Sequence, residues 1–207
     1  MLNIVNEFLA SYKGQDLLKT IDNEYQNYTV YPKKDDLFKA FKLCLNPKVV
    51  IIGQDPYHDG SADGLAFSSQ VKMPPSLKNI FKEILTNYPN SKALLSSDLS
   101  YLAEQGVLLM NASLSVKAKQ PNSHKDIWQE FFAFMMSALN ERFNNLVFML
   151  WGNFAKKYEY LIDANKHLIL TAAHPSPLAR GEFFGNGHFL KCNEYLKAIG
   201  KKEINWI

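Results

Sequence analysis

The chain of 207 residues contains only two cysteines, Cys44 and Cys192. Two thiols are too few for a zinc ribbon or a four-cysteine iron–sulfur cluster, so both are expected to be buried and reduced. No segment approaches the roughly 18 apolar residues of a membrane span. The first twenty residues also lack the charged start and apolar middle of a signal peptide. These absences favour a soluble protein that stays in the cytoplasm.

An internal repeat, a low-complexity tract and a Gly/Ser-rich linker are absent too, so nothing marks a boundary between domains. Hydrophobic residues make up 47% of the chain and aromatic residues 13%, enough to bury one sizeable core. Residues 1–207 are therefore expected to form a single domain. The net charge of +3 fits a protein that contacts phosphates on one face, but so mild an excess decides nothing alone.

Four apolar runs, each followed at once by polar residues, organise the sequence. They span residues 49–52, 107–110, 146–150 and 168–170. Within each run the apolar residues are continuous and do not alternate with polar ones. Such runs are typical of parallel strands buried on both faces of the sheet. Between them lie apolar positions with helical spacing, which are Leu77, Ile80, Phe81, Ile84 and Leu85, then Phe131, Phe132, Met135 and Leu139, then Tyr158, Leu161 and Ile162. The order predicts an α/β fold of three layers, α/β/α, around a parallel sheet.

The carboxyl ends of the predicted strands collect polar residues. Gln54 and Asp55 follow the first run, Asn111 follows the second and His174 the fourth. Ligands of open parallel sheets bind at this edge, so the sequence predicts one polar site there. A plainer interpretation remains, because strands must end and the loops after them are usually polar. An Asp-Pro pair such as Asp55-Pro56 by itself indicates only a turn.

Four short motifs occur in the order found in family 1 uracil-DNA glycosylases. They are GQDPYH at 53–58, PPSL at 74–77, LLMN at 108–111 and HPSPL at 174–178. The sequence resembles that family from about residue 31 to about residue 195. The resemblance implies a central four-stranded parallel sheet flanked by helices. It also implies a monomer that flips uracil out of DNA and hydrolyses the N-glycosidic bond of deoxyuridine, in base-excision repair and without a metal or cofactor.

The resemblance assigns the chemistry to Asp55 and His174. Cleavage builds positive charge on the sugar and negative charge on the departing uracil. Asp55 would act on the water or the oxocarbenium ion, and His174 would donate to uracil O2, helped by backbone amides near Gln54. Both interactions favour the transition state over the ground state. Without the motif, a histidine after a strand is more often a structural residue.

The resemblance places the uracil base among Gln54, Tyr57, Phe67 and Asn111. The Asn111 amide would donate to uracil O4 and accept from N3–H, the reverse of what cytosine needs. The Phe67 ring would stack on the flipped base, and Tyr57 would crowd C5 and exclude the methyl group of thymine. Outside the family context, a strand-end asparagine usually bonds locally and a phenylalanine usually belongs to the core.

The same resemblance gives Ser76, Ser176 and Leu178 to DNA binding. The serines resemble contacts that compress the DNA backbone, and Leu178 resembles the wedge that enters the minor groove when uracil leaves. Ser76 also begins a predicted amphipathic helix, where the role of N-cap is the alternative. An exposed leucine after Ser-Pro ordinarily has no function, so this assignment depends on the motif.

Some positions depart from the family pattern. The loop after His58 is one residue shorter than usual and adds Asp59 and Asp63 where DNA should approach. Ala179 stands where a serine usually follows the wedge leucine. These departures leave open the affinity for DNA and the preference between single-stranded and duplex DNA.

Two other classes of protein remain as alternatives. One is a non-catalytic DNA-binding or polymerase-processivity protein on the same fold, which loss of Asp55 or His174 would have favoured. The other is a glycosylase with broader base choice or an iron–sulfur cluster. Tyr57 together with Asn111 argues against the broader choice, and two cysteines argue against the cluster. Uracil-containing DNA is the expected partner, and an inhibitor protein is a further candidate.

Overall fold

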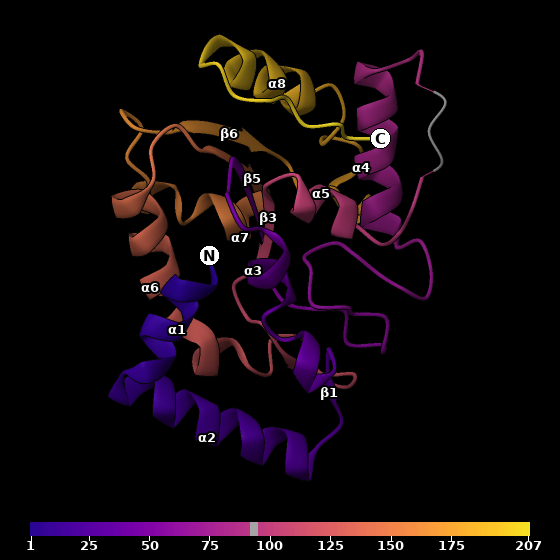
Figure 1. Cartoon of the computed structure of the whole chain (residues 1–207). Helices are drawn as coiled ribbons and strands as arrows, with labels where there is room; N and C mark the ends of the chain where they lie inside the picture. The colour runs from indigo at the N-terminus through magenta and orange to yellow at the C-terminus, as the bar shows by residue number, and fades with distance from the viewer. Residues whose placement is uncertain (92–94) are drawn as a thin grey trace.

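Four parallel strands form the central sheet of the computed structural model, which describes residues 1–91 and 95–207 (Figure 1). They are β2 (Val49–Gly53), β3 (Val107–Asn111), β5 (Val147–Trp151) and β6 (Leu168–Ala172). Their order in the sheet is β3-β2-β5-β6, so β2 and β5 are the central strands. The four apolar runs form these four strands, which confirms the predicted parallel sheet.

Helices lie on both sides of the sheet. α1 (Leu2–Ala10), α2 (Tyr12–Asn27) and α6 (Lys125–Arg142) contact one another on one side, and α4 (Pro75–Asn87) contacts α8 (His188–Ala198) on the other (Figure 1). The shorter helices are α3 (Lys39–Leu43), α5 (Ser100–Glu104) and α7 (Gly152–Lys156). This is the predicted α/β/α arrangement. None of the described helices is both long enough and apolar enough to cross a membrane.

Smaller elements connect these layers. β1 (Val30–Tyr31) pairs antiparallel with β4 (Val116–Lys117) in a separate two-stranded sheet. The chain also forms 3-10 turns at η1 (Lys34–Asp36), η2 (Glu159–Leu161) and η3 (Pro177–Ala179). The last of these turns contains part of the HPSPL motif, so the motif lies on a short turn after β6 rather than on a helix or strand.

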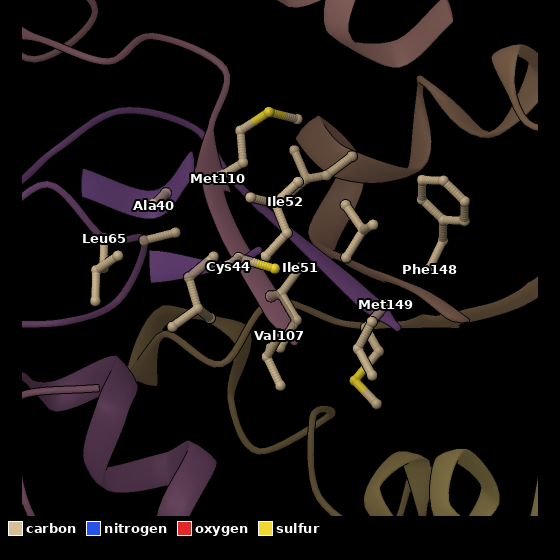
Figure 2. Close-up of a cluster of buried hydrophobic side chains, with 14 of the residues drawn as sticks. Ala40, Cys44, Ile51, Ile52, Leu65, Val107, Met110, Phe148 and Met149 are labelled. Carbon is tan, nitrogen blue, oxygen red and sulfur yellow. The ribbon is translucent and has the colours of Figure 1, made fainter. Parts of the chain in front are cut away.

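Burial differs between the two edges of the sheet. Every residue of β2, β3 and β5 is buried, whereas β6 buries only Ala172. Figure 2 shows how the pleat distributes side chains, with Ile51 and Met149 on one side of the sheet and Ile52 and Phe148 on the other. The prediction of burial on both faces is therefore correct for three strands and wrong for β6. Helices α3 and α5 pack against the edge at β3, and β6 has less cover.

The predicted helical faces are correct in two cases and wrong in the third. The first face is buried in α4 except for the half-buried Leu85, and the second is buried in α6. Tyr158, Leu161 and Ile162 do not share an α-helix, because α7 ends at Lys156 and the chain continues in η2. Residues three apart also align on a 3-10 turn, so three apolar positions could not distinguish the two structures.

Ser76 is not the N-cap of α4, so that alternative role is wrong. The N-cap is Pro74, without a side-chain hydrogen bond, and the helix begins at Pro75. A proline suits this first position because it lacks the N–H that would have no partner there. Ser76 lies in the first turn, and its hydroxyl group is not needed to cap the helix.

Candidate active site

The predicted polar edge exists, and residues at the ends of β2, β3 and β6 contribute to it. Gln54 and Asp55 directly follow β2, and Asn111 is the last residue of β3, paired in register with Gly53. His174 lies two residues beyond the end of β6. Because parallel strands end at the same edge, these residues from distant parts of the chain form one site.

Two glycines make room for the site side chains. Gly53 ends β2, and a Cβ atom there would collide with Oδ1 of Asn111. Gly152 follows β5 with a φ of +82°, and a Cβ atom there would lie 2.8 Å from Cβ of His174. Any side chain at either glycine would displace a predicted site residue. The glycines at the ends of the central strands β2 and β5 thus leave space for Asn111 of β3 and for His174, which follows β6.

Asp55 is half-buried and has one oxygen fixed by the backbone. Its Oδ2 accepts a hydrogen bond from the N–H of Asn122 at 2.7 Å. Burial raises the pKa of the carboxyl group, and the bond from Asn122 and the nearby His58 oppose this rise. Oδ1 takes part in none of the hydrogen bonds formed among residues 1–91 and 95–207. The carboxylate is therefore held in one orientation with one oxygen left for a ligand.

Asn122 is a site residue that sequence reasoning missed. Besides its backbone bond to Asp55, its Oδ1 accepts from Nε2 of Gln54 at 2.5 Å. Its φ of +64° lies in the left-handed region, which asparagine tolerates better than most residues. The one local signal was the pair Pro121-Asn122, and such a pair marks a turn rather than a site. One residue thus fixes both side chains that follow β2.

His174 is arranged as a neutral hydrogen-bond donor. Its Nδ1 accepts the backbone N–H of Ser176 at 3.0 Å, and burial lowers the pKa of the imidazole. Because Nδ1 uses its lone pair in that bond, the proton of the neutral ring lies on Nε2. The Nε2–H group is then available to a bound molecule.

Phe67 has a strained backbone beside His174. Its φ is +65°, which side chains of this size rarely adopt. Its ring centroid lies 5.9 Å from that of His174 and 5.7 Å from that of Trp151. The Trp151 indole donates to Nδ1 of His188 at 3.0 Å, and burial lowers the pKa of His188 to about 4, so that ring stays a neutral acceptor. Such strain persists only where surrounding contacts enforce it, and it is concentrated at functional sites.

Two acids of the shortened loop are neutralised internally. Asp63 is buried and accepts from Oγ of Ser68 at 2.7 Å and from Nζ of Lys39 at 3.3 Å. Asp59 pairs with Lys72 at 2.6 Å. Asp63 is thus buried away from the surface that DNA would approach, whereas Asp59 remains exposed beside Lys72. A buried carboxylate must be paired and hydrogen-bonded, and here these bonds brace the segment that carries the strained phenylalanine.

Asn111 and Tyr57 both present polar groups that have no partner among residues 1–91 and 95–207. Asn111 is 6% exposed, and its amide forms none of the side-chain hydrogen bonds found in the described part of the chain. The local bond that is usual for a strand-end asparagine is thus not formed there. Tyr57 is half-buried, and its hydroxyl group is buried with no partner among the described residues. Burial raises the pKa of Tyr57, so the phenol stays neutral.

The loop after His174 is anchored to α4. Oγ of Ser176 accepts the backbone N–H of Leu178 at 3.2 Å, and the Asn79 amide of α4 donates to the carbonyl of Pro175 at 2.7 Å. Leu178 at the centre of η3 is 91% exposed. The expected exposure of this leucine is therefore confirmed. An apolar side chain that projects fully from a fixed turn is suited to contact with another molecule.

Glu83 fixes the segment that follows this turn. It is fully buried in α4, and its carboxylate accepts the backbone N–H groups of Gly185 at 2.8 Å and Gly187 at 3.0 Å. Sequence reasoning missed this residue because a glutamate in an amphipathic helix usually faces solvent. Helix α4 therefore holds both ends of the loop that presents Leu178.

The chain matches known proteins along nearly its whole length. Residues 41–197 match the model of the Uracil DNA glycosylase superfamily. The uracil-DNA glycosylase of Campylobacter hominis is 51% identical over 97% of this chain and 87% of its own, and that of Campylobacter jejuni subsp. doylei is 54% identical over 97% and 91%. The chain belongs to the uracil-DNA glycosylase superfamily. A crystal structure of a mimivirus UNG variant in complex with UGI has a TM-score of 0.92 at 26% identity, covering 99% of this chain and 86% of that one.

As a uracil-DNA glycosylase, the protein removes uracil from DNA in base-excision repair by hydrolysing an N-glycosyl bond. The alternative of a non-catalytic DNA-binding protein on the same fold is therefore set aside. The sheet of four parallel strands flanked by helices agrees with that of the solved UNG structures.

The exposure of Leu178 leads to a prediction about the rate at which this uracil-DNA glycosylase releases uracil. If the side chain fills the space that the extruded base leaves, as the motif implies, Leu178→Ala should slow uracil release from duplex DNA by about tenfold, or about 1.4 kcal/mol. Release from single-stranded DNA, which needs no such plug, should be nearly unchanged. Single-turnover rates on both substrates provide the measurement.

The matched control for this prediction is Leu45→Ala, which truncates a leucine that is 65% exposed on a different surface loop. This control should change neither rate. Equal mutant-to-wild-type ratios on duplex and single-stranded DNA would show that Leu178 has only a structural role.

Proposed function

We propose that this uracil-DNA glycosylase uses Asp55 and His174 as its catalytic residues. The C1′–N1 bond of a flipped deoxyuridine breaks, and its electron pair stays on the uracil. The Asp55 carboxylate stabilises the positive charge on the sugar, orients the water that attacks C1′ and accepts the proton that this water gives up. The proton then passes to solvent, and the uracil anion takes one up. Nε2–H of His174 donates to uracil O2, helped by backbone amides near Gln54, as the negative charge develops.

One observation carries this proposal. A half-buried carboxylate with one fixed oxygen and a neutral histidine with its proton on Nε2 lie at the same edge of the sheet. A neutral donor suits a leaving group that becomes negative during the reaction, because the hydrogen bond strengthens as charge builds and needs no proton transfer. The products are free uracil and an abasic site.

Base recognition is proposed for four residues around this pair, with Phe67 stacked on the flipped uracil and Asn111 bonded to O4 and N3–H. Tyr57 would exclude the methyl group of thymine, and Gln54 would border the base. The free amide of Asn111 and the strained backbone of Phe67 support these roles. A site with fixed hydrogen-bond polarity rejects the mismatched base edge far more strongly than a shape-selective pocket does.

DNA binding is proposed for Ser76, Ser176 and Leu178. Ser76 lies in the first turn of α4, where backbone N–H groups and the helix dipole favour a phosphate. Ser176 and Leu178 lie together on the turn that α4 anchors. Because α4 would hold the wedge Leu178 and the two serines that contact phosphates, these residues could compress the DNA backbone while the base leaves the stack.

A single assay tests the proposed reaction. The protein is incubated, with a chelator present, with a labelled oligonucleotide that contains one uracil, and alkali then cleaves any abasic site. Cleavage only at uracil, together with free uracil in equal amount, is the expected result. Matching oligonucleotides with thymine or cytosine at that position measure selectivity, and cleavage of either at a comparable rate would refute the proposed base recognition.

Asn111→Asp should weaken selectivity. A protonated carboxyl group at this position can donate to N3 of cytosine and accept from its 4-amino group, so weak release of cytosine should be detectable. Uracil release should fall by roughly tenfold, because an unpaired polar group in a buried site costs about 1–3 kcal/mol. Free cytosine is measured chromatographically beside the wild-type protein. No cytosine release from a folded variant would place the discrimination against cytosine in another residue.

We further propose a monomer with a single domain, located in the cytoplasm. A hydrophobic cluster that extends from α1 to the C-terminal residues supports the single domain, and bacterial relatives support the location. The mimivirus UNG variant in complex with UGI supports UGI as an inhibitor partner for this chain as well. Loss of uracil release on addition of purified UGI would test that interaction.

A further inference from the structure

A groove of about 510 Å³ opens beside the candidate uracil site and shares Gln54 with it. Gln54 and Asn122, which are bonded to each other, line the groove on one side. The rest of the lining comes from α6, from the segment from α7 to η2, and from Ala112 and Ser113, which follow β3. The groove therefore extends from the candidate uracil site across the hydrogen-bonded pair Gln54 and Asn122.

Aromatic rings form one wall of the groove. Tyr158 packs edge-on against Phe132 at 4.7 Å and against Phe154 at 5.6 Å between ring centroids. Tyr160 lies beyond them and is 81% exposed, so its ring is free on the surface. A free aromatic face beside a packed aromatic wall is suited to stacking with a nucleobase, because every base offers a π face.

The charge of the lining is positive. Lys125 and Lys157 line the groove, and none of its lining residues is acidic. Neither lysine belongs to an ion pair within the described part of the chain, and the Lys157 ammonium lies 4.3 Å from the ring centroid of Phe154. A second surface groove, of about 440 Å³ between α1, α2 and α6, instead has three acids in its lining, which are Asp16, Asp126 and Glu130.

We propose that the groove binds the single-stranded DNA that continues from the flipped uracil. A neighbouring base stacks on Tyr160, and Lys125 and Lys157 hold the phosphates on either side of it. This inference rests on the proposed function, because the groove begins at Gln54 and Asn122 in the proposed uracil site. Stacking platforms interleaved with cations are the general means by which proteins hold single strands without regard to sequence.

The test compares two single-stranded substrates, a trinucleotide with a central uracil and a 15-nucleotide strand with uracil at its centre. Tyr160→Ala should raise KM for the long strand by about tenfold relative to KM for the trinucleotide, because one stacked base is lost. Lys157→Gln should reduce the slope of log KM against log salt by about 0.7 for the long strand, which corresponds to one phosphate contact. Both side chains are exposed, and thermal melting checks that the variants are folded.

Tyr12→Ala is the matched control, because Tyr12 is 88% exposed and lines the acidic groove. It should leave the ratio of the two KM values unchanged. Equal ratios for Tyr160→Ala and Tyr12→Ala would overturn the groove proposal, as would an unchanged salt slope for Lys157→Gln. Wild-type protein that releases no uracil from either substrate would instead refute the proposed function, so the two failures are distinguishable.

Discussion

Asp55→Asn is expected to lower kcat on uracil-containing DNA by roughly 10²–10⁴-fold and to leave the affinity for DNA nearly unchanged. An asparagine keeps the shape of the side chain and can still accept from the backbone N–H of Asn122. It cannot carry the negative charge that stabilises the sugar cation in the proposed reaction, nor take a proton from the water. Single-turnover rates and a binding titration on the same oligonucleotide separate chemistry from affinity.

Asp59→Asn is the matched control for this substitution. Asp59 lies four residues further along the same loop, is exposed and pairs only with Lys72 and the neighbouring Ser61 among the described residues. An exposed ion pair contributes little, so this variant should keep a rate close to that of the wild type. A wild-type rate in Asp55→Asn would remove Asp55 from the mechanism.

The pH dependence gives a second check on Asp55. The proposed reaction needs the ionised carboxylate, and burial raises the pKa of Asp55 above the ordinary value of about 3.9. Activity should therefore fall with decreasing pH at a higher pH than an exposed aspartate would give. The residual rate of Asp55→Asn should not show this fall in activity with decreasing pH.

The sheet and the motif residues were predictable from the sequence because each depends on a local pattern. An apolar run without alternation defines a buried strand, and the polar residue that follows it is then placed at the edge of the sheet. The prediction was wrong at β6, where the run is short and the strand is only partly covered. It was wrong again near Tyr158, where three apolar positions fit an α-helix and a 3-10 turn equally well.

The residues that orient the site were not predictable, because their contacts join distant parts of the chain. Asn122 reaches Asp55 across 67 residues, and Glu83 reaches Gly185 across 102. An exposed polar turn residue and a helical glutamate have no pattern that indicates such a partner. Sequence reasoning therefore gave the residues that would touch the substrate and missed those that hold them in place.

His174→Ala should lower kcat by roughly 10²–10³-fold, the usual contribution of one preorganised donor to a developing anion. The loss should appear in kcat and in kcat/KM alike, since the proposed bond to uracil O2 strengthens only as negative charge builds. Steady-state kinetics on a single-stranded substrate measure both parameters without the cost of opening a duplex. A variant that changes only KM would make His174 a binding residue rather than a catalytic one.

The protonation state of His174 provides an independent test of the same role. Burial lowers the pKa of this imidazole below its ordinary value of about 6.5, so the ring should become protonated at a lower pH than an exposed histidine does. Any loss of the wild-type rate through protonation of this ring should therefore occur at a lower pH than the ordinary histidine pKa would give. Protonation at lower pH would place a proton on Nδ1 and break its bond from the N–H of Ser176. A wild-type rate that rises or falls about a midpoint near 6.5, and loses this step in His174→Ala, would mean that the histidine acts through its charge and not as a neutral donor.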